Sequence, residues 1–102
     1  EYLKTVSASS PLRAGVERSL GQAQESQRLF KDAAEQYEKA AKDSPSRMDQ
    51  ADNYMSAGRC YEALTDYARA KTTFDKVANE YTDTPMANEA EIRLGEIQGQ
   101  GK

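Results

Sequence analysis

Apolar residues recur along the chain at the spacing of helix faces. In two stretches they stand three or four positions apart, so that each set falls on one side of a helix. The two sets are Phe30, Ala33, Ala34, Tyr37, Ala40 and Ala41, and Tyr67, Ala70, Phe74, Val77, Ala78 and Tyr81. The sequence has no run of alternating β-branched residues and no Asn-Gly or Asp-Gly hairpin turn. The pattern predicts an all-α protein.

Capping residues divide this pattern into helices. Ser10 and Thr84 each stand before a proline, which places a capping hydroxyl next to proline at the first helical position. The run Ser46-Arg47-Met48-Asp49 resembles a capping box, and Asp66 can cap the helix that follows it. The five expected helices lie near residues 11–26, 29–43, 47–63, 67–81 and 85–97.

The chain also repeats itself. Gly21, Gly58 and Gly95 stand 37 positions apart, and the same shift places Phe30 on Tyr67. Internal repeats of this length are typical of helical arrays. We expect a single segment over residues 1–102, with the end of a preceding unit at 1–10, a first unit at 11–46, a second at 47–83, the first helix of a third at 84–98, and a tail at 99–102.

Composition narrows the possible functions. The 102 residues include no histidine, so the usual general base and the commonest metal ligand are missing, and we expect no catalytic, cofactor or metal site. The net charge of −3 is spread along the chain, which disfavours nucleic-acid binding. No apolar run approaches the roughly 20 residues of a membrane span, so direct membrane insertion is not expected.

Two residues in the middle of the chain have both functional and structural explanations. Gly58 could be a hinge, but its recurrence as Gly21 and Gly95 favours close packing between helices. Cys60 is the only cysteine and could be a nucleophile, but the chain supplies no histidine base. We interpret Cys60 as a small apolar core residue. The paired carboxylates, such as Asp49 with Asp52, are interpreted as solvated helix surface.

The repeated residues resemble the tetratricopeptide repeat, a helix–turn–helix unit with the pattern W-x2-L-G-x2-Y, then A-x3-F, then P. The second unit matches at Tyr54, Ala57, Gly58, Tyr61, Ala70 and Phe74; the first matches at Leu20, Gly21, Ala33, Tyr37 and Pro45. Glu17 and Gln24 depart from the pattern, which weakens the first helix or exposes its face. The resemblance implies an all-α repeat solenoid of about five helices, wound as a right-handed superhelix.

The period is longer than the usual one for this family. Together with the stretch EYTDTPMANEAEIRLGEI at residues 80–97, it is similar to a bacterial subset of the family. That subset includes the periplasmic protein that accompanies the Tol–Pal system and the repeat lipoprotein of outer-membrane assembly. The similarity favours the periplasm or cell envelope over the cytoplasm.

The resemblance also implies a function, because the first helices of such units line a concave groove that receives a protein or peptide partner. The corresponding residues are Arg18, Gln22, Glu25, Asp52, Met55, Arg59, Glu62, Glu89, Ile92 and Glu96. The asparagines of the family's carboxylate clamp are missing. Met55 and Ile92 are instead expected to be apolar anchors, surrounded by charge, for an amphipathic or extended segment.

Other functions stay open. The chain could be a structural spacer without a groove ligand. An enzyme is not expected, because the repeat already accounts for each residue that could have served as a catalytic group. The third unit has no second helix to cover Ile92, Leu94 and Ile97. Because stacked units bury their apolar faces only against neighbours, we expect self-association through this end or a longer parent chain.

Overall fold

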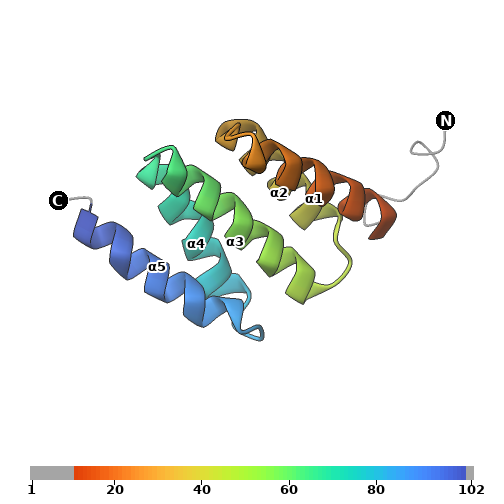
Figure 1. The fold of residues 1–102 in the computed structure, drawn as a ribbon. Helices are drawn as coiled ribbons and strands as arrows, with labels where there is room; N and C mark the ends of the chain where they lie inside the picture. The colour runs from red at the N-terminus through yellow and green to blue at the C-terminus, as the bar shows by residue number, and fades with distance from the viewer. Residues whose placement is uncertain (1–10, 101–102) are drawn as a thin grey trace.

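Residues 11–100 fold into five helices joined by short turns. In a computed structural model, which describes residues 11–100, they are α1 (Pro11–Ser26), α2 (Phe30–Asp43), α3 (Arg47–Ala63), α4 (Tyr67–Glu80) and α5 (Met86–Gln100) (Figure 1). The all-α helical repeat is confirmed. Residues 1–10, expected to end a preceding unit, lie outside the described residues, as do residues 101–102 of the expected tail. Gly99 and Gln100 are not tail, because α5 includes both.

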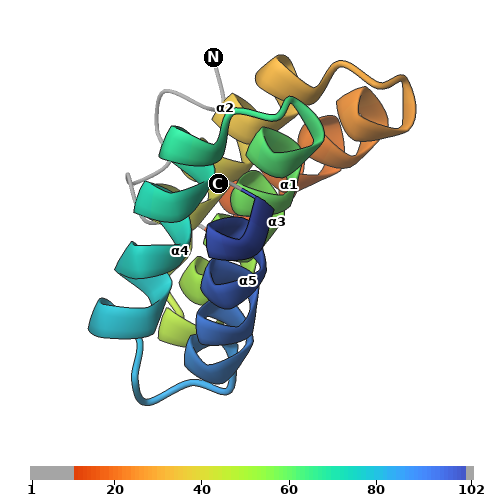
Figure 2. The ribbon, with the colours of Figure 1, turned by 90° about the vertical axis from the view of Figure 1, so that its left-hand side faces the viewer.

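The helices form two layers. α1, α3 and α5 lie side by side in one layer, and α2 and α4 form the other (Figures 1 and 2). Consecutive helices pack against each other, and α3 also contacts α5. First helices of successive units therefore share one face of the molecule, which is the face seen in Figure 1.

The turn inside each complete unit has the same geometry. Arg28 and Thr65, one period apart, both adopt left-handed backbone conformations, with φ of 64° and 56°. After each of them the chain donates a hydrogen bond back across the helix end, from Leu29 N–H to the Gln24 carbonyl and from Asp66 N–H to the Tyr61 carbonyl. These six-to-one bonds satisfy carbonyls that the helix end would leave open. The backbone conformation of the turn therefore repeats along with the sequence.

The caps agree with the sequence in part. The Ser46 hydroxyl accepts a hydrogen bond from Asp49 N–H, and the Asp66 carboxylate accepts one from Arg69 N–H, as expected. Thr84 differs, because its hydroxyl donates to the Tyr81 carbonyl and α5 begins only at Met86.

Aromatic rings packed on glycines hold each helix pair together. A Cβ atom on Gly58 would meet the Phe74 ring at 2.5 Å, and one on Gly21 would meet the Tyr37 ring at 3.2 Å. Both rings are buried, together with many small alanines. The packing interpretation of Gly58 is confirmed. Gly95 differs, since a Cβ atom there would meet nothing within 4 Å.

Candidate functional site

All ten residues predicted for the groove lie on the first-helix layer. Arg18, Gln22 and Glu25 come from α1, Asp52, Met55, Arg59 and Glu62 from α3, and Glu89, Ile92 and Glu96 from α5. We call this face of α1, α3 and α5 the groove face. Helical spacing explains the arrangement, because residues three or four apart fall on one side of each helix.

Ion pairs connect α1 to α3 across the groove face. Arg18 lies 3.1 Å from the Asp52 carboxylate and also donates a hydrogen bond to the Asn53 side chain. The opposite polarity recurs two turns along, where Arg59 of α3 lies 4.0 Å from Glu25 of α1. Each of these four side chains keeps roughly a third or more of its surface exposed, so solvent screens the pairs and each adds little stability.

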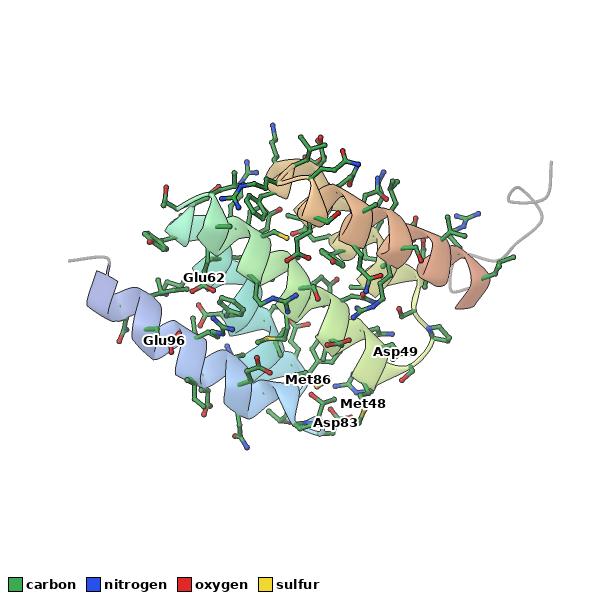
Figure 3. All side chains as sticks on the ribbon, viewed as in Figure 1. Met48, Asp49, Glu62, Asp83, Met86 and Glu96 are labelled. Carbon is green, nitrogen blue, oxygen red and sulfur yellow. The ribbon has the colours of Figure 1, made fainter. Side chains whose placement is uncertain are left out.

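A third connection joins α3 to α5. Arg93 lies 3.5 Å from Glu62 and 3.9 Å from Glu96. Figure 3 shows Glu62 and Glu96 towards the same end of their two helices. Arg93 was missed by the sequence reasoning because the other units carry serine at its position. Its three-residue spacing from Glu96 was the available signal.

Met55 does not lie on the groove surface as predicted. Its side chain is only 2% exposed and belongs to the hydrophobic core. Ile92, one period later, is 63% exposed. The two residues differ in their place in the layer: ion pairs connect α3 to a first helix on each side, α1 and α5, whereas in the described part of the chain α5 has a first helix on one side only. Of the two predicted apolar anchors, Ile92 is accessible and Met55 is not.

Carboxylates outnumber guanidinium groups on this face. Glu25, Asp52, Glu62, Glu89 and Glu96 oppose Arg18, Arg59 and Arg93. Glu62 is the most enclosed of the ion-paired side chains, with 19% of its side chain exposed. Burial raises the pKa of the Glu62 carboxyl, and the Arg93 charge lowers it in part. The α5 end is the most accessible part of the face, with Glu89 and Glu96 exposed on either side of Ile92.

The two departures from the repeat pattern in α1 lie against α2. Glu17 stands where α3 has Tyr54, and its carboxyl lies beside that of Asp43. Burial, followed by hydrogen bonding and repulsion from Asp43, raises the pKa of Glu17 to about 7. Glu17 Oε1 and Gln24 Oε1 are both buried without a hydrogen-bond partner. Burying these two oxygens without partners costs free energy, which is the physical reason to expect a weaker α1.

Cys60 is placed as the sequence suggested. The thiol is 1% exposed and sits in the core, where burial raises its pKa to about 11. Such a thiol is a poor nucleophile because little thiolate forms near neutral pH. Within residues 11–100, no three histidine, cysteine or acidic side chains are grouped as a metal site would need. The same residues include no helix with the length and apolar character to cross a membrane.

Comparison with known proteins identifies one segment. Residues 52–84 match the family model of the tetratricopeptide repeat. The match begins in α3, includes α4, and ends before α5. No curated protein and no solved structure matches the chain. Residues 52–84 are therefore a tetratricopeptide repeat, within an all-α helical repeat, and repeats of this kind indicate a protein-interaction module.

Proposed function

We propose that the groove face binds a positively charged segment of a protein partner, and that the chain acts as an interaction module within a larger protein or assembly. The proposal rests on the repeat at residues 52–84 and on one observation: exposed Ile92 stands between exposed Glu89 and Glu96 at the α5 end of the face. An apolar contact with flanking carboxylates suits an amphipathic segment carrying lysine or arginine.

The charge balance of the groove face supports a basic partner. Arg18, Arg59 and Arg93 are each paired with a carboxylate of a neighbouring first helix. A partner's carboxylate would have to displace such a pair to reach a guanidinium. Among the described residues Glu89 forms no such pair, so a partner's lysine or arginine can meet this exposed carboxylate directly, and the surplus of carboxylates on the face favours a cationic ligand.

Selection from a random peptide library tests this proposal. We expect the recovered peptides to be enriched in lysine and arginine beside apolar residues. Their affinity should fall by about tenfold or more in the double variant Glu89→Lys with Glu96→Lys. The matched control is the double variant Asp32→Lys with Glu35→Lys, which places the same charge change on the exposed surface of α2. Acidic peptides, or equal binding by the groove variant and the control, would contradict the proposal.

A structural spacer is the second candidate function. The observation that favours it is the set of ion pairs between first helices. They connect α1 to α3 and α3 to α5, so they hold successive first helices in register. Because each pair adds little stability, its part in a spacer is to fix the spacing of the helices, and a spacer binds no ligand on this face. Saturable peptide binding that the variant Glu89→Lys with Glu96→Lys removes would favour the interaction module, and absence of saturable binding would favour the spacer.

The narrower assignment to cell-envelope repeats belongs to the proposal as well. It is supported by the 37-residue period and by the residue 80–97 stretch. A catalytic role is not proposed, because the sequence features that suggested one are a core cysteine and solvated carboxylates.

A further inference from the structure

A hollow opens between α2 and α4, the two helices of the second layer. Its volume is about 410 Å³, which is in the range of small-ligand sites. Glu38 of α2 lies on one wall, and Thr73, Lys76 and Glu80 of α4 lie on the other. Tyr54 of α3 lies between them, because α3 packs against both α2 and α4. None of the residues predicted for the groove face lines this space, which we call the α2–α4 hollow.

A buried tyrosine presents a hydroxyl without a protein partner to the α2–α4 hollow. Three other buried tyrosine hydroxyls each donate a hydrogen bond, those of Tyr37, Tyr61 and Tyr81. Tyr54 is only 8% exposed, yet its hydroxyl donates to no residue within 11–100. A tyrosine buried to this extent usually finds a partner. The Tyr54 hydroxyl is therefore available to a ligand in the hollow.

Carboxylates dominate the charge around that hydroxyl. Burial raises the pKa of Tyr54, Lys76 lowers it in part, and the charges of Glu38 and Glu80 raise it further. Both carboxylates therefore lie near the hydroxyl. Glu80 is paired with Lys76 at 3.1 Å. Glu38 accepts a hydrogen bond from Tyr61 with one oxygen and forms no ion pair with a described residue, so its other oxygen is left for a cationic group.

The Tyr54 ring already attracts one cation. The Lys76 ammonium lies 5.3 Å from the ring centroid, within the distance at which an aromatic ring attracts a positive charge. Lys76 keeps 38% of its side chain exposed, so solvent reaches this arrangement. The chain itself thus shows which kind of group suits the ring, namely an ammonium on an alkyl chain.

We propose that the α2–α4 hollow binds a primary ammonium group carried on an alkyl chain. The ammonium donates hydrogen bonds to the free oxygen of Glu38 and to the Tyr54 hydroxyl. An ammonium has three donors and no acceptor, so it matches two oxygen atoms, whereas an anion would face the carboxylates. The proposal goes beyond the groove face, because the site lies in the other helix layer and binds a small group.

Titration with butylamine tests the proposal. Amide shifts of the labelled full chain are followed by NMR at about 0.15 M salt, which screens attraction between distant exposed charges. We expect saturable changes around Glu38, Thr73 and Lys76, and none with butanol, the neutral molecule of the same chain length. A blocked tripeptide with a central lysine is the second probe. Whichever probe binds more tightly identifies the source as a free amine or a protein lysine, and both results support an ammonium site.

Three variants separate the groups that bind the ammonium. Glu38→Gln keeps an acceptor for Tyr61 but removes the charge, and should weaken butylamine binding by about tenfold or more. Glu91→Gln makes the same change on exposed α5 and should bind normally. Tyr54→Phe removes only the hydroxyl and should weaken binding by about threefold or more. Its melting temperature should not change, because the hydroxyl has no partner to lose.

A gain of affinity tests the role of Lys76. Lys76→Gln removes the cation that lies over the Tyr54 ring and frees Glu80 from its ion pair. Butylamine should then bind about threefold or more tightly, because its ammonium no longer meets a like charge.

The groove variant Glu89→Lys with Glu96→Lys should bind butylamine as the unmodified chain does, so failure of this site and failure of the groove proposal are distinguishable. Four results would overturn the proposal: no saturable binding, equal binding of butanol, an unchanged affinity in Glu38→Gln or Lys76→Gln, or loss of amine binding in the groove variant.

Discussion

The Phe74 ring lies against Gly58 so closely that a Cβ atom on residue 58 would stand 2.5 Å from its Cε1 atom. Phe74 is fully buried, so its ring moves only by disturbing its neighbours. We predict that Gly58→Ala lowers the free energy of unfolding by about 1–3 kcal/mol, because overpacking outweighs the helix propensity of alanine. Chemical denaturation measures the change.

Gly95→Ala is the matched control. It makes the same chemical change at the same repeat position, but a Cβ atom there has open space. Unfolding should therefore cost up to about 1 kcal/mol more than in the unmodified chain. A similar effect of alanine at both glycines would remove the packing explanation.

The carboxyl of Glu17 makes stability depend on pH. Its pKa is raised from 4.5 to about 7 in the folded chain, so folding favours the neutral form. The resulting stability is fully present below the unfolded pKa and is lost as the pH rises through about 7. We predict that Glu17→Gln, which is neutral at every pH, raises the melting temperature more near pH 8 than near pH 5.

Glu91→Gln controls for the loss of a negative charge, since Glu91 occupies the same repeat position but is exposed. Its difference in melting temperature between the two pH values should match that of the unmodified chain. An equal pH-dependent gain in both variants would mean that net charge, and not the buried carboxyl, is responsible.

Cys60 should resist thiol reagents in the folded chain. It is 1% exposed, and its pKa of about 11 leaves little thiolate at neutral pH. We predict labelling by a disulfide reagent at a rate set by unfolding, with rapid reaction once denaturant is added. Labelling of the native chain as fast as a free thiol would place Cys60 at the surface.

Thr65 is the strained residue of the second unit. Its φ of 56° is unfavourable for a β-branched side chain, and glycine adopts that conformation freely. We predict that Thr65→Gly raises the free energy of unfolding by about 0.5–1 kcal/mol. Thr72→Gly, in the middle of α4, should instead lower it, so a loss of stability in both variants would contradict the strain.

The helices and their glycine contacts were predictable because local spacing encodes them. Gly21 and Gly58 sit one period apart, and each meets an aromatic ring that follows it by the same interval. The positive φ at Thr65 was not predictable, since no glycine marks it.

The candidate site was less predictable, because exposure depends on neighbouring helices. Met55 and Ile92 occupy equivalent positions, yet Met55 is 2% exposed in α3, the middle helix of the first-helix layer, and Ile92 is 63% exposed in α5 at the edge of that layer. Arg93 departs from the repeat, so shifting the sequence onto itself could not reveal its contact with Glu62. A contact made by a residue that departs from the repeat is found only from the three-dimensional arrangement of the helices.

Partner binding on the groove face is the central claim, and NMR mapping of the backbone amides tests it most directly. A cationic peptide from the selection is added to the labelled chain, and shift changes are read for every residue. We predict the largest shift changes around Ile92 and Glu96 of α5, with smaller changes at Arg59 and Glu62, the neighbouring groove-face residues of α3. Changes centred on Glu35 of α2 or Lys71 of α4 would contradict the claim.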